Sequence, residues 1–134
     1  MLNHLVPDDP ALLFAAANQL YPGGRETAEQ RLIYDKALKL LETRAAPKPG
    51  DLHLQAVLHG ALGQREKAVK AYRTALERAP LEVAWHFEFG RLLYEVGQLP
   101  EARRELLAVL GQQPGNEEAR QLLERLEREV AEGK

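Results

Sequence analysis

The histidines are the first residues to weigh as candidates for chemistry. The chain has four of them, His4, His53, His59 and His86. Two zinc ligands on one helix are typically four residues apart, so that both lie on the same face. His53 and His59 are six apart, which places them on opposite sides of a helix. We therefore predict no metal site and no cofactor, and expect His53 on an exposed face and His59 or His86 within the packing.

Nucleophilic catalysis finds little support in the composition. The chain contains no cysteine and no serine, which excludes thiol chemistry, disulfides and serine-based acyl transfer. The acidic residues mostly alternate with lysine and arginine along helical segments, as they do on solvated faces. The sequence predicts no catalytic residue, and hence a protein that is not an enzyme.

Length and charge narrow the remaining classes. A chain of 134 residues with 45% hydrophobic and 28% charged residues has the size of one globular domain. Its longest apolar run, residues 11–17, is far shorter than a membrane span, and no signal-peptide pattern opens the chain, so we expect no membrane insertion. A net charge of −2 argues against nucleic-acid binding, which usually needs a basic face. The composition does not decide between a cytoplasmic and a periplasmic protein.

The elements that position these residues follow a period of 34 residues. Small residues, turn glycines and closing prolines that recur at such a period are typical of helix-turn-helix repeats, which bury their apolar faces by stacking on one another. The residues that match at this offset are Ala56 and Gly90, Gly63-Gln64 and Gly97-Gln98, Ala68 and Ala102, Tyr72 and Leu106, Leu76 and Leu110, and Pro80 and Pro114.

Each recurring type has a steric reason. Small residues allow two helices to approach closely. A glycine at the end of the first helix can adopt the left-handed capping conformation at no steric cost. A proline ends the second helix because it lacks the amide hydrogen and disfavours helix in the residue before it. The alternative, a phosphate-binding glycine loop, needs a preceding strand and a glycine-rich spacing, and neither is present.

The two units 49–82 and 83–116 resemble the tetratricopeptide repeat family. The first carries the family pattern at Leu52, Ala56, Gly63, Ala68, Tyr72, Ala75 and Pro80, and the second at Phe89, Gly90, Leu93, Gly97, Ala102, Leu106 and Pro114, with departures at Gln55 and Val109. The resemblance implies an all-α fold, a right-handed helix-turn-helix solenoid of about three repeats plus a C-terminal capping helix. Residues 1–134 would form this single domain.

A divergent first repeat is predicted for residues 10–48. Asp9 and Pro10 offer a cap and a first helical residue, and Thr27 with Gln30 is a capping box that opens the second helix. Helical spacing predicts that this second helix buries the apolar residues Leu32, Ile33, Ala37, Leu40 and Leu41. The segment Leu5–Asp8 resembles the tail of an earlier repeat, so we expect the chain to be cut from a longer array.

A capping helix is predicted for residues 117–131, with Asn116 as its N-cap. One apolar stripe faces a densely charged side, as a terminal helix requires. The stripe consists of Ala119, Leu122, Leu123, Leu126 and Val130. A coiled coil is the alternative, but the apolar pattern lasts only about two heptads.

In repeats of this family the first helix of each unit lines a concave groove, which the resemblance implies as the binding site. Aromatic residues and arginine are enriched at binding hot spots. The groove residues implied are Phe14, Asn18 and Tyr21 in repeat 10–48, His53 and Val57 in repeat 49–82, Phe87, Arg91 and Tyr94 in repeat 83–116, and Gln121 and Arg125 in the capping helix. Phe14 and Phe87 fit the inter-repeat core equally well, whereas the one-turn spacing of Arg91 and Tyr94 favours exposure.

The resemblance also implies a class of partner. Some family members hold a terminal carboxylate between basic groups, but Phe14, Ala84 and Glu88 stand at the positions concerned. We therefore expect a protein or peptide partner with an amphipathic helix or an extended apolar segment. The function predicted is a protein-interaction scaffold, monomeric or weakly self-associating, within a larger multi-repeat protein. The alternative is a subunit of an assembly complex, because residues 11–38 faintly resemble repeat subunits of bacterial cytochrome c biogenesis.

Overall fold

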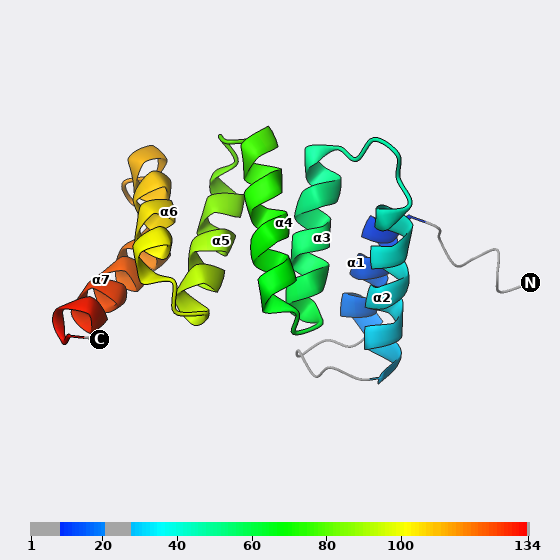
Figure 1. Cartoon of the computed structure of the whole chain (residues 1–134), viewed down its shortest axis with the longest axis horizontal. Helices are drawn as coiled ribbons and strands as arrows, with labels where there is room; N and C mark the ends of the chain where they lie inside the picture. The colour runs from blue at the N-terminus through cyan, green and yellow to red at the C-terminus, as the bar shows by residue number, and fades with distance from the viewer. Residues whose placement is uncertain (1–8, 21–27, 134) are drawn as a thin grey trace, which may run out of the picture. The chain divides into compact units, whose positions relative to one another are not determined.

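A computed structural model describes residues 9–20 and 28–133 of the chain. These residues form α-helices and no strand (Figure 1). The helices are α1 (Pro10–Leu20), α2 (Ala28–Glu42), α3 (Pro49–Ala61), α4 (Arg65–Arg78), α5 (Val83–Glu95), α6 (Leu99–Gln112) and α7 (Glu117–Ala131). The chain divides into two compact units, residues 1–71 and 72–134, with the division inside α4.

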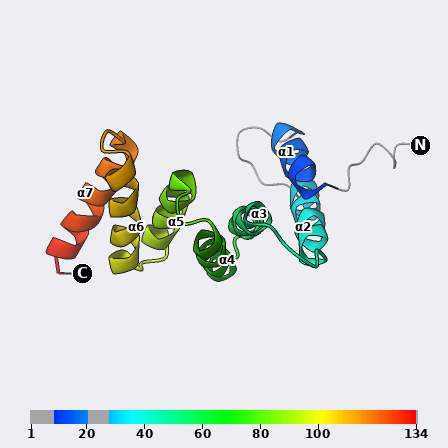
Figure 2. The same cartoon turned by 90° about the horizontal axis from the view of Figure 1, so that it is seen from above.

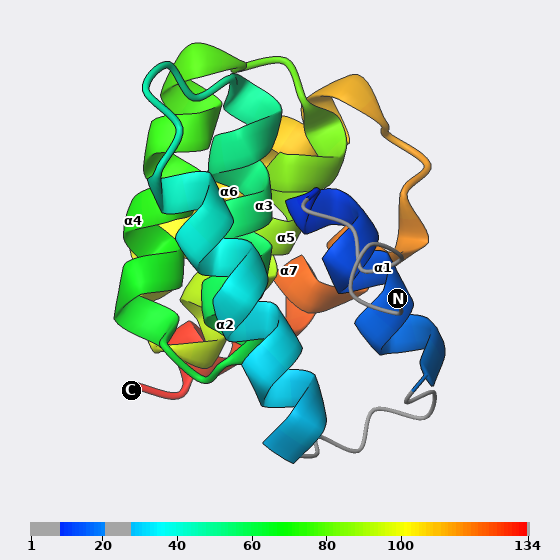
Figure 3. The same ribbon diagram turned by 90° about the vertical axis from the view of Figure 1, so that its right-hand side faces the viewer.

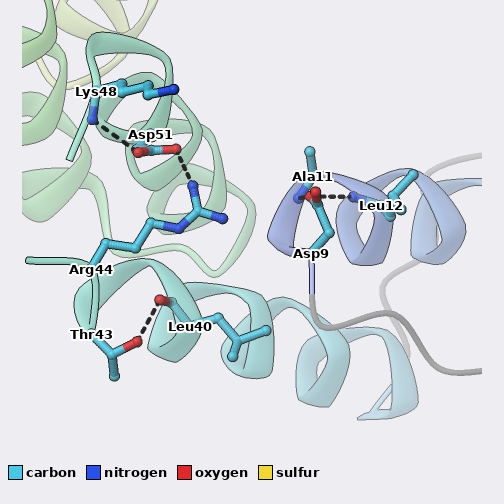
Figure 4. A network of polar contacts seen from close by, with 8 residues as sticks. All are labelled: Asp9, Ala11, Leu12, Leu40, Thr43, Arg44, Lys48 and Asp51. Carbon is cyan, nitrogen blue, oxygen red and sulfur yellow. Dashed lines mark hydrogen bonds and ion pairs between the residues drawn. The ribbon is translucent and has the colours of Figure 1, made fainter. Parts of the chain in front are cut away.

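Polar side chains cap the helices where the sequence predicts it. The Asp9 carboxylate accepts hydrogen bonds from the amides of Ala11 and Leu12, at 2.8 and 3.3 Å, and so starts α1 (Figure 4). Asn116 accepts from the amide of Ala119 at 2.9 Å and starts α7. Each bond satisfies one of the amides that the first turn of a helix leaves without a partner. The predicted capping residue Thr27 lies outside the described residues.

The turn glycines end two helices as expected. Gly63 and Gly97 have φ angles of +77° and +86°, which disfavour any residue with a Cβ. The following amides then reach back into the preceding helix: Gln64 donates to the carbonyl of His59 at 2.8 Å and Gln98 to that of Leu93 at 2.9 Å. This pattern closes the last turns of α3 and α5 and sends the chain into the next helix.

In the first unit, α1 packs on α2 and α2 packs on α3 (Figures 1 and 3). The core that joins the three helices consists of Leu13, Ala17, Tyr34, Ala37, Leu38, Leu41, Leu58 and Leu62. One expected member is missing from it. Leu32 is 70% exposed, because the buried stripe of α2 is centred on Tyr34 and Ala37, and Leu32 falls on the opposite side of the helix. The prediction that α2 buries Leu32 was wrong, while Ile33 and Leu40 are half-buried against the core.

The connection between α2 and α3 is tied down by one carboxylate. Asp51, in the first turn of α3, accepts from the backbone amide of Lys48 at 2.9 Å and from the Arg44 guanidinium at 2.6 Å (Figure 4). Just before, the Thr43 hydroxyl donates to the Leu40 carbonyl at 2.8 Å. The residues between the two helices therefore have polar partners at both ends.

In the second unit, α5 packs along α6, and α7 packs on α6 and also contacts α5 (Figures 1 and 2). A Cβ placed on Gly90 would lie 3.3 Å from the side chain of Leu106, so the absence of a side chain sets how closely α5 and α6 approach. Ala102 and Leu106 are fully buried on the α6 side. The close approach predicted from these small residues is confirmed.

The last helix turns most of its predicted stripe inward. Ala119, Leu123 and Leu126 are buried and Leu122 is half-buried, but Val130 is 50% exposed. The helix ends at Ala131, one residue later, so the last turn extends beyond the surface it covers. Val130 belongs to the apolar stripe by its position but lies exposed at the end of the helix. The division into repeats 10–48, 49–82 and 83–116, and the capping role of residues 117–131, stay predictions.

Candidate functional site

The second unit places five of the sequence-predicted residues on two helices that touch. Phe87, Arg91 and Tyr94 follow one another along α5, three or four residues apart, and therefore share one side of the helix. Gln121 and Arg125 are one turn apart on α7, which contacts α5. We call this surface the α5–α7 face, and it consists of Phe87, Arg91, Tyr94, Gln121 and Arg125.

Arg91 is fixed by an aromatic ring. Its guanidinium carbon lies 5.7 Å from the centre of the Phe87 ring, within the range of a cation–π interaction. Arg91 is exposed and Phe87 is half-buried. The ring thus supports the arginine from below while the hydrogen-bond donors of the guanidinium remain accessible.

Tyr94 joins the two helices. Its hydroxyl donates to the Glu129 carboxylate of α7 at 2.8 Å. This hydrogen bond, with desolvation and the negative charge of Glu129, raises the pKa of the Tyr94 phenol, while the positive charge of Arg125 opposes the rise. Arg125 therefore lies beside the same phenol, and the contact holds α5 and α7 in a fixed relation at this point.

A hollow of about 240 Å³ lies beside Phe87. It is lined by Val83, Ala84, Phe87, Glu88, Gln113 and Asn116. Its walls are apolar on the α5 side, and its rim carries one carboxylate and two amides. A hollow of this kind can take an apolar side chain whose neighbours offer hydrogen-bond donors.

The Glu88 carboxylate on that rim is held by a tyrosine. The hydroxyl of Tyr72 donates to it at 2.9 Å. Burial, followed by the charge and hydrogen bond of Glu88, raises the pKa of Tyr72 far above its ordinary value of 10.0. Tyr72 therefore stays protonated and acts as a permanent donor to Glu88.

The first unit presents its predicted residues differently. Phe14 is half-buried, and its ring lies 5.5 Å from that of Tyr34. Asn18 is exposed, but its carbonyl oxygen accepts a hydrogen bond from the Tyr34 hydroxyl. His53 and Val57 of α3 are both half-buried. Tyr21 lies outside the described residues.

His86 lies between packed helices, and the sequence predicted this position for either His59 or His86. Its Nδ1 is 2.5 Å from a carboxylate oxygen of Glu105 on α6, and its Nε2 is 2.7 Å from the carbonyl oxygen of Pro80. Burial opposes the charged imidazole, but these two bonds and the charge of Glu105 outweigh it and raise the pKa of His86. Both partners are acceptors, so the ring satisfies both only when both nitrogens carry hydrogen.

Sequence reasoning missed the polar groups that complete the site. Glu129 lies 35 residues after Tyr94, one more than the repeat period, so the periodicity alone did not pair them. Gln113 and Asn116 line the hollow beside Phe87, although only a capping role was predicted for Asn116. A signal for Glu129 was available, because it lies one helical turn after Arg125 on the same side of the last helix.

The described residues carry few other candidate sites. None of their clusters of histidine, aspartate or glutamate could hold a metal ion. In that same part of the chain, no helix is long and apolar enough to cross a membrane.

The helices define an all-α protein built from helix pairs that follow one another along the chain. Residues 53–117 match the family profile of the tetratricopeptide repeat. This part of the chain is therefore similar to the tetratricopeptide repeat family, and the all-α helical-repeat fold predicted from the 34-residue period is confirmed. No curated protein sequence matches the chain significantly.

Solved structures of tetratricopeptide repeat domains are similar to the chain. The first such domain of Spaghetti (RPAP3), bound to an HSP90 peptide, has a TM-score of 0.70 at 19% identity and covers 92% of this chain and 94% of its own. The Sgt2 domain from Aspergillus fumigatus has a TM-score of 0.67 at 20% identity, over 96% and 82%. The Yersinia enterocolitica type III secretion chaperone SycD, in complex with a peptide of the translocator YopD, has a TM-score of 0.56 at 18% identity, over 92% and 91%. At these identities the likeness shows the fold.

Proposed function

We propose that the protein is an interaction scaffold that binds a peptide segment of a partner protein on the α5–α7 face. The observation that carries the proposal is the arrangement of this face: Arg91 over the ring of Phe87, beside a hollow of about 240 Å³. Arginine and aromatic side chains that lie together at a surface are the types most enriched at binding hot spots.

The fold supports the same function. Tetratricopeptide repeat structures similar to this chain were solved with an HSP90 peptide, an HSP70 peptide and a translocator peptide. The α5–α7 face lies on the first helix of the predicted repeat 83–116 and on the predicted capping helix, where the family resemblance implies a binding surface. The Tyr94–Glu129 bond adds rigidity, and a surface that is ordered before binding loses less entropy when the partner docks.

The test is a selection for peptides. A phage-displayed library of random peptides of about 12 residues is panned on the immobilised chain, and the enriched peptides are remade and measured by fluorescence anisotropy. Such a peptide, when extended, is longer than α5 and can follow the whole face. We expect Arg91→Ala and Tyr94→Ala each to weaken binding by about tenfold or more, because truncation at a hot spot costs about 2 kcal/mol.

Two control changes lie on other surfaces of the same unit. Glu77 on α4 and Arg104 on α6 are exposed, and Glu77→Ala and Arg104→Ala should leave the affinity unchanged. Thermal unfolding of Arg91→Ala, Glu77→Ala and Arg104→Ala should stay close to the parent, since exposed substitutions usually cost within about 0.5 kcal/mol. Tyr94→Ala also loses the bond to Glu129, so its affinity is measured at a temperature at which the variant is folded. If the control pair weakens binding and the α5–α7 pair does not, the face is wrong.

The groove residues of the first unit, and the alternative role in an assembly complex, stay predictions. The resemblance to cytochrome c biogenesis subunits falls on residues 11–38, part of which lies outside the described residues. The peptide selection applies to either role, because a subunit of an assembly complex would also need a protein-binding surface.

A further inference from the structure

We infer that His86 positions the α5 wall of the hollow beside Phe87, and that it does so only while both nitrogens of its ring carry hydrogen. This inference rests on the proposed function, because the hollow lies beside the face that would bind the peptide, and it adds a dependence of that binding on pH. The α5 wall lies within the first two turns of the helix and consists of Val83, Ala84, Phe87 and Glu88.

Apolar packing holds the first turn of α5 less firmly than the middle of the helix. Phe89, Gly90 and Leu93 are buried, whereas every residue from 83 to 87 is half-buried or exposed. The N-cap residue Glu82 gives the helix no side-chain hydrogen bond, unlike the N-caps of α1 and α7. Since the first amides of a helix have no partner within it, the position of this turn depends on other polar contacts.

The α4–α5 turn, which consists of residues 79–82, is held mainly by polar contacts. Leu81 is 80% exposed, so its side chain does not anchor the turn. The backbone hydrogen bond that the Glu82 amide makes across the turn is long, at 3.4 Å. The Nε2 atom of His86 lies 2.7 Å from the carbonyl oxygen of Pro80 and thereby joins the turn to α5.

The other ring nitrogen joins α5 to α6. The Nδ1 atom of His86 lies 2.5 Å from a carboxylate oxygen of Glu105. The two helices are close here, because a Cβ placed on Gly90 would lie 3.3 Å from the Cβ of Glu105. From Glu105 the helix continues to Gln112, and Gln113 lies directly after it on the opposite wall of the hollow. The bond to Glu105 therefore helps to fix the distance between the two walls.

The two bonds together need two hydrogens on the ring. A carbonyl and an ionised carboxylate only accept hydrogen bonds, so a neutral imidazole with one N–H can satisfy only one of them. The bond to the charged carboxylate of Glu105 is the stronger of the two and keeps the hydrogen. Nε2 of His86 then turns a lone pair toward the Pro80 carbonyl oxygen, and the repulsion between them releases the α4–α5 turn from the helix.

The charges around the ring favour its protonated form. Glu105 faces it from α6, while Glu101, one turn earlier on α6, is paired with Arg73 of α4 at 2.6 Å, and Glu82 lies one turn before it in the chain. Burial opposes the charged ring, but its two hydrogen bonds and the negative charge of Glu105 outweigh burial and raise the pKa of His86 above the ordinary 6.5. The wall is therefore held below pH 6.5 and is released as the pH rises through the raised pKa.

Peptide binding and proton binding at His86 are then linked. A peptide side chain in the hollow contacts the wall in the position that the protonated ring gives it, so the peptide binds the protonated state better. We expect the affinity to fall about fivefold between about pH 5.5 and about pH 9, the factor that corresponds to the net free energy of one hydrogen bond. By reciprocity, the bound peptide should raise the pKa of His86 further, by the logarithm of the ratio of the two affinities.

A first experiment needs no peptide, because Trp85, the one tryptophan of the chain, lies in the first turn of α5. Quenching of its fluorescence by acrylamide is measured as a function of pH, and NMR of the imidazole follows the titration of His86 in the same samples. We expect Trp85 to become more accessible as the ring loses its proton. The variant His86→Gln should show no such change, whereas the matched control His59→Gln, which removes an imidazole from the first unit, should behave as the parent does.

The charge on α6 gives a second variant. Glu105→Gln removes the carboxylate that favours the protonated ring, so the change in accessibility of Trp85 should move to lower pH. This variant also decides the matter if His86→Gln does not fold. A change that stays at the pH of the parent in Glu105→Gln would overturn the inference.

The second experiment measures binding. A peptide is selected on the parent at about pH 6, where the ring is charged, and is chosen without histidine and with both ends blocked, so that the peptide itself does not titrate between neutral and mildly basic pH. Fluorescence anisotropy then gives its affinity across the same pH range. The affinity of the parent and of His59→Gln should fall with the titration of the His86 ring, and that of His86→Gln should stay constant.

Each contrary result has a defined meaning. Binding that needs Arg91 and Tyr94 but does not change with pH overturns this inference and leaves the proposed function standing. Binding that depends on pH equally in the parent and in His86→Gln does the same. A selection that yields no peptide counts against the proposed function, and the tryptophan measurement then decides the inference by itself. An accessibility of Trp85 that stays constant through the titration of His86 would overturn it.

Discussion

By the division into repeats predicted from the sequence, Asn18 in α1 and Arg91 in α5 correspond to each other, yet their side chains have different partners. Asn18 accepts a hydrogen bond from Tyr34 on the second helix of its own repeat. The residue of α6 that matches Tyr34 is Leu106, because Tyr34 precedes Ala37 as Tyr72 precedes Ala75, and Leu106 lies one repeat period after Tyr72. Leu106 has no hydroxyl and is fully buried. The second helix thus supplies a hydrogen-bond donor for Asn18, whereas the matching leucine of α6 has none to offer Arg91.

The difference between Tyr34 and Leu106 also affects how α2 packs on α1 and how α6 packs on α5. The Tyr34 ring lies tilted against that of Phe14, with the ring centres 5.5 Å apart, and Ala17 and Ala37 of the same two helices are fully buried. Leu106 instead lies against Gly90, which has no side chain. An aromatic contact joins the first pair of helices, and a leucine against a glycine joins the second.

The largest effects should come from filling the small positions between paired helices. Ala102 in α6 and Ala37 in α2 are fully buried, and Ala102→Leu and Ala37→Leu should each lower the free energy of unfolding by about 1–3 kcal/mol through overpacking. Chemical denaturation of the two variants measures this. If Ala37→Leu is tolerated and Ala102→Leu is not, the aromatic spacing of the first repeat leaves room that the α5–α6 pair lacks.

A single methyl group tests the contact at Gly90. Gly90→Ala brings a Cβ to 3.3 Å from Leu106 and Glu105, so we expect a loss of about 1 kcal/mol in place of the gain that alanine usually brings to a helix. The matched change Gly111→Ala in α6 has nothing within 4 Å of the new Cβ. It should be neutral or stabilising by up to about 1 kcal/mol. Equal melting temperatures for the two variants would mean that the approach of α5 and α6 is looser than described.

Removing the tyrosine hydroxyls addresses the comparison itself. Tyr34→Phe breaks the bond to Asn18 and should cost about 1 kcal/mol, the usual net value of a hydrogen bond. Tyr94→Phe breaks a bond whose acceptor is the half-buried Glu129 carboxylate, and because hydrogen bonds to charged groups are the stronger ones it should cost somewhat more, about 1.5 kcal/mol. Thermal unfolding ranks the two. A larger loss for Tyr34→Phe would show that the bond inside the first unit matters more for stability than the bond between α5 and α7.

The smallest effect expected is a dependence of stability on pH through His86. Its pKa is raised in the folded protein above the ordinary value of 6.5, so the charged ring stabilises the fold fully below pH 6.5. That contribution is lost as the pH rises through the raised pKa. Urea unfolding measured at several pH values from 6 upward should show this decline. The variant His86→Gln should lack it, and a decline of the same size in that variant would assign it to another group.

The sequence alone was enough to predict the helices, the caps at Asp9 and Asn116 and the turns at Gly63 and Gly97. Asp9, Asn116, Gly63 and Gly97 act locally, and a local signal survives without knowledge of the rest of the chain. The burial of Leu32 could not be predicted correctly, because it depends on which side of α2 meets α1 and α3. The Tyr94–Glu129 hydrogen bond was not predicted for a related reason. It depends on the distance between two side chains on different helices, and the repeat period does not give that distance.

The turn glycines have a consequence of another kind. Gly63 and Gly97 lie at positive φ, yet a Cβ added to either would meet nothing within 4 Å. The constraint at these positions is thus one of handedness and not of size. An L-amino acid is disfavoured at positive φ even though there is room for its side chain, whereas D-alanine, whose preferred φ is positive, fits the turn without a change of backbone conformation. Chemically introduced D-alanine at either position should narrow the unfolded ensemble and stabilise the fold by about 0.4–1 kcal/mol, a gain that none of the genetically encoded L-residues can reach.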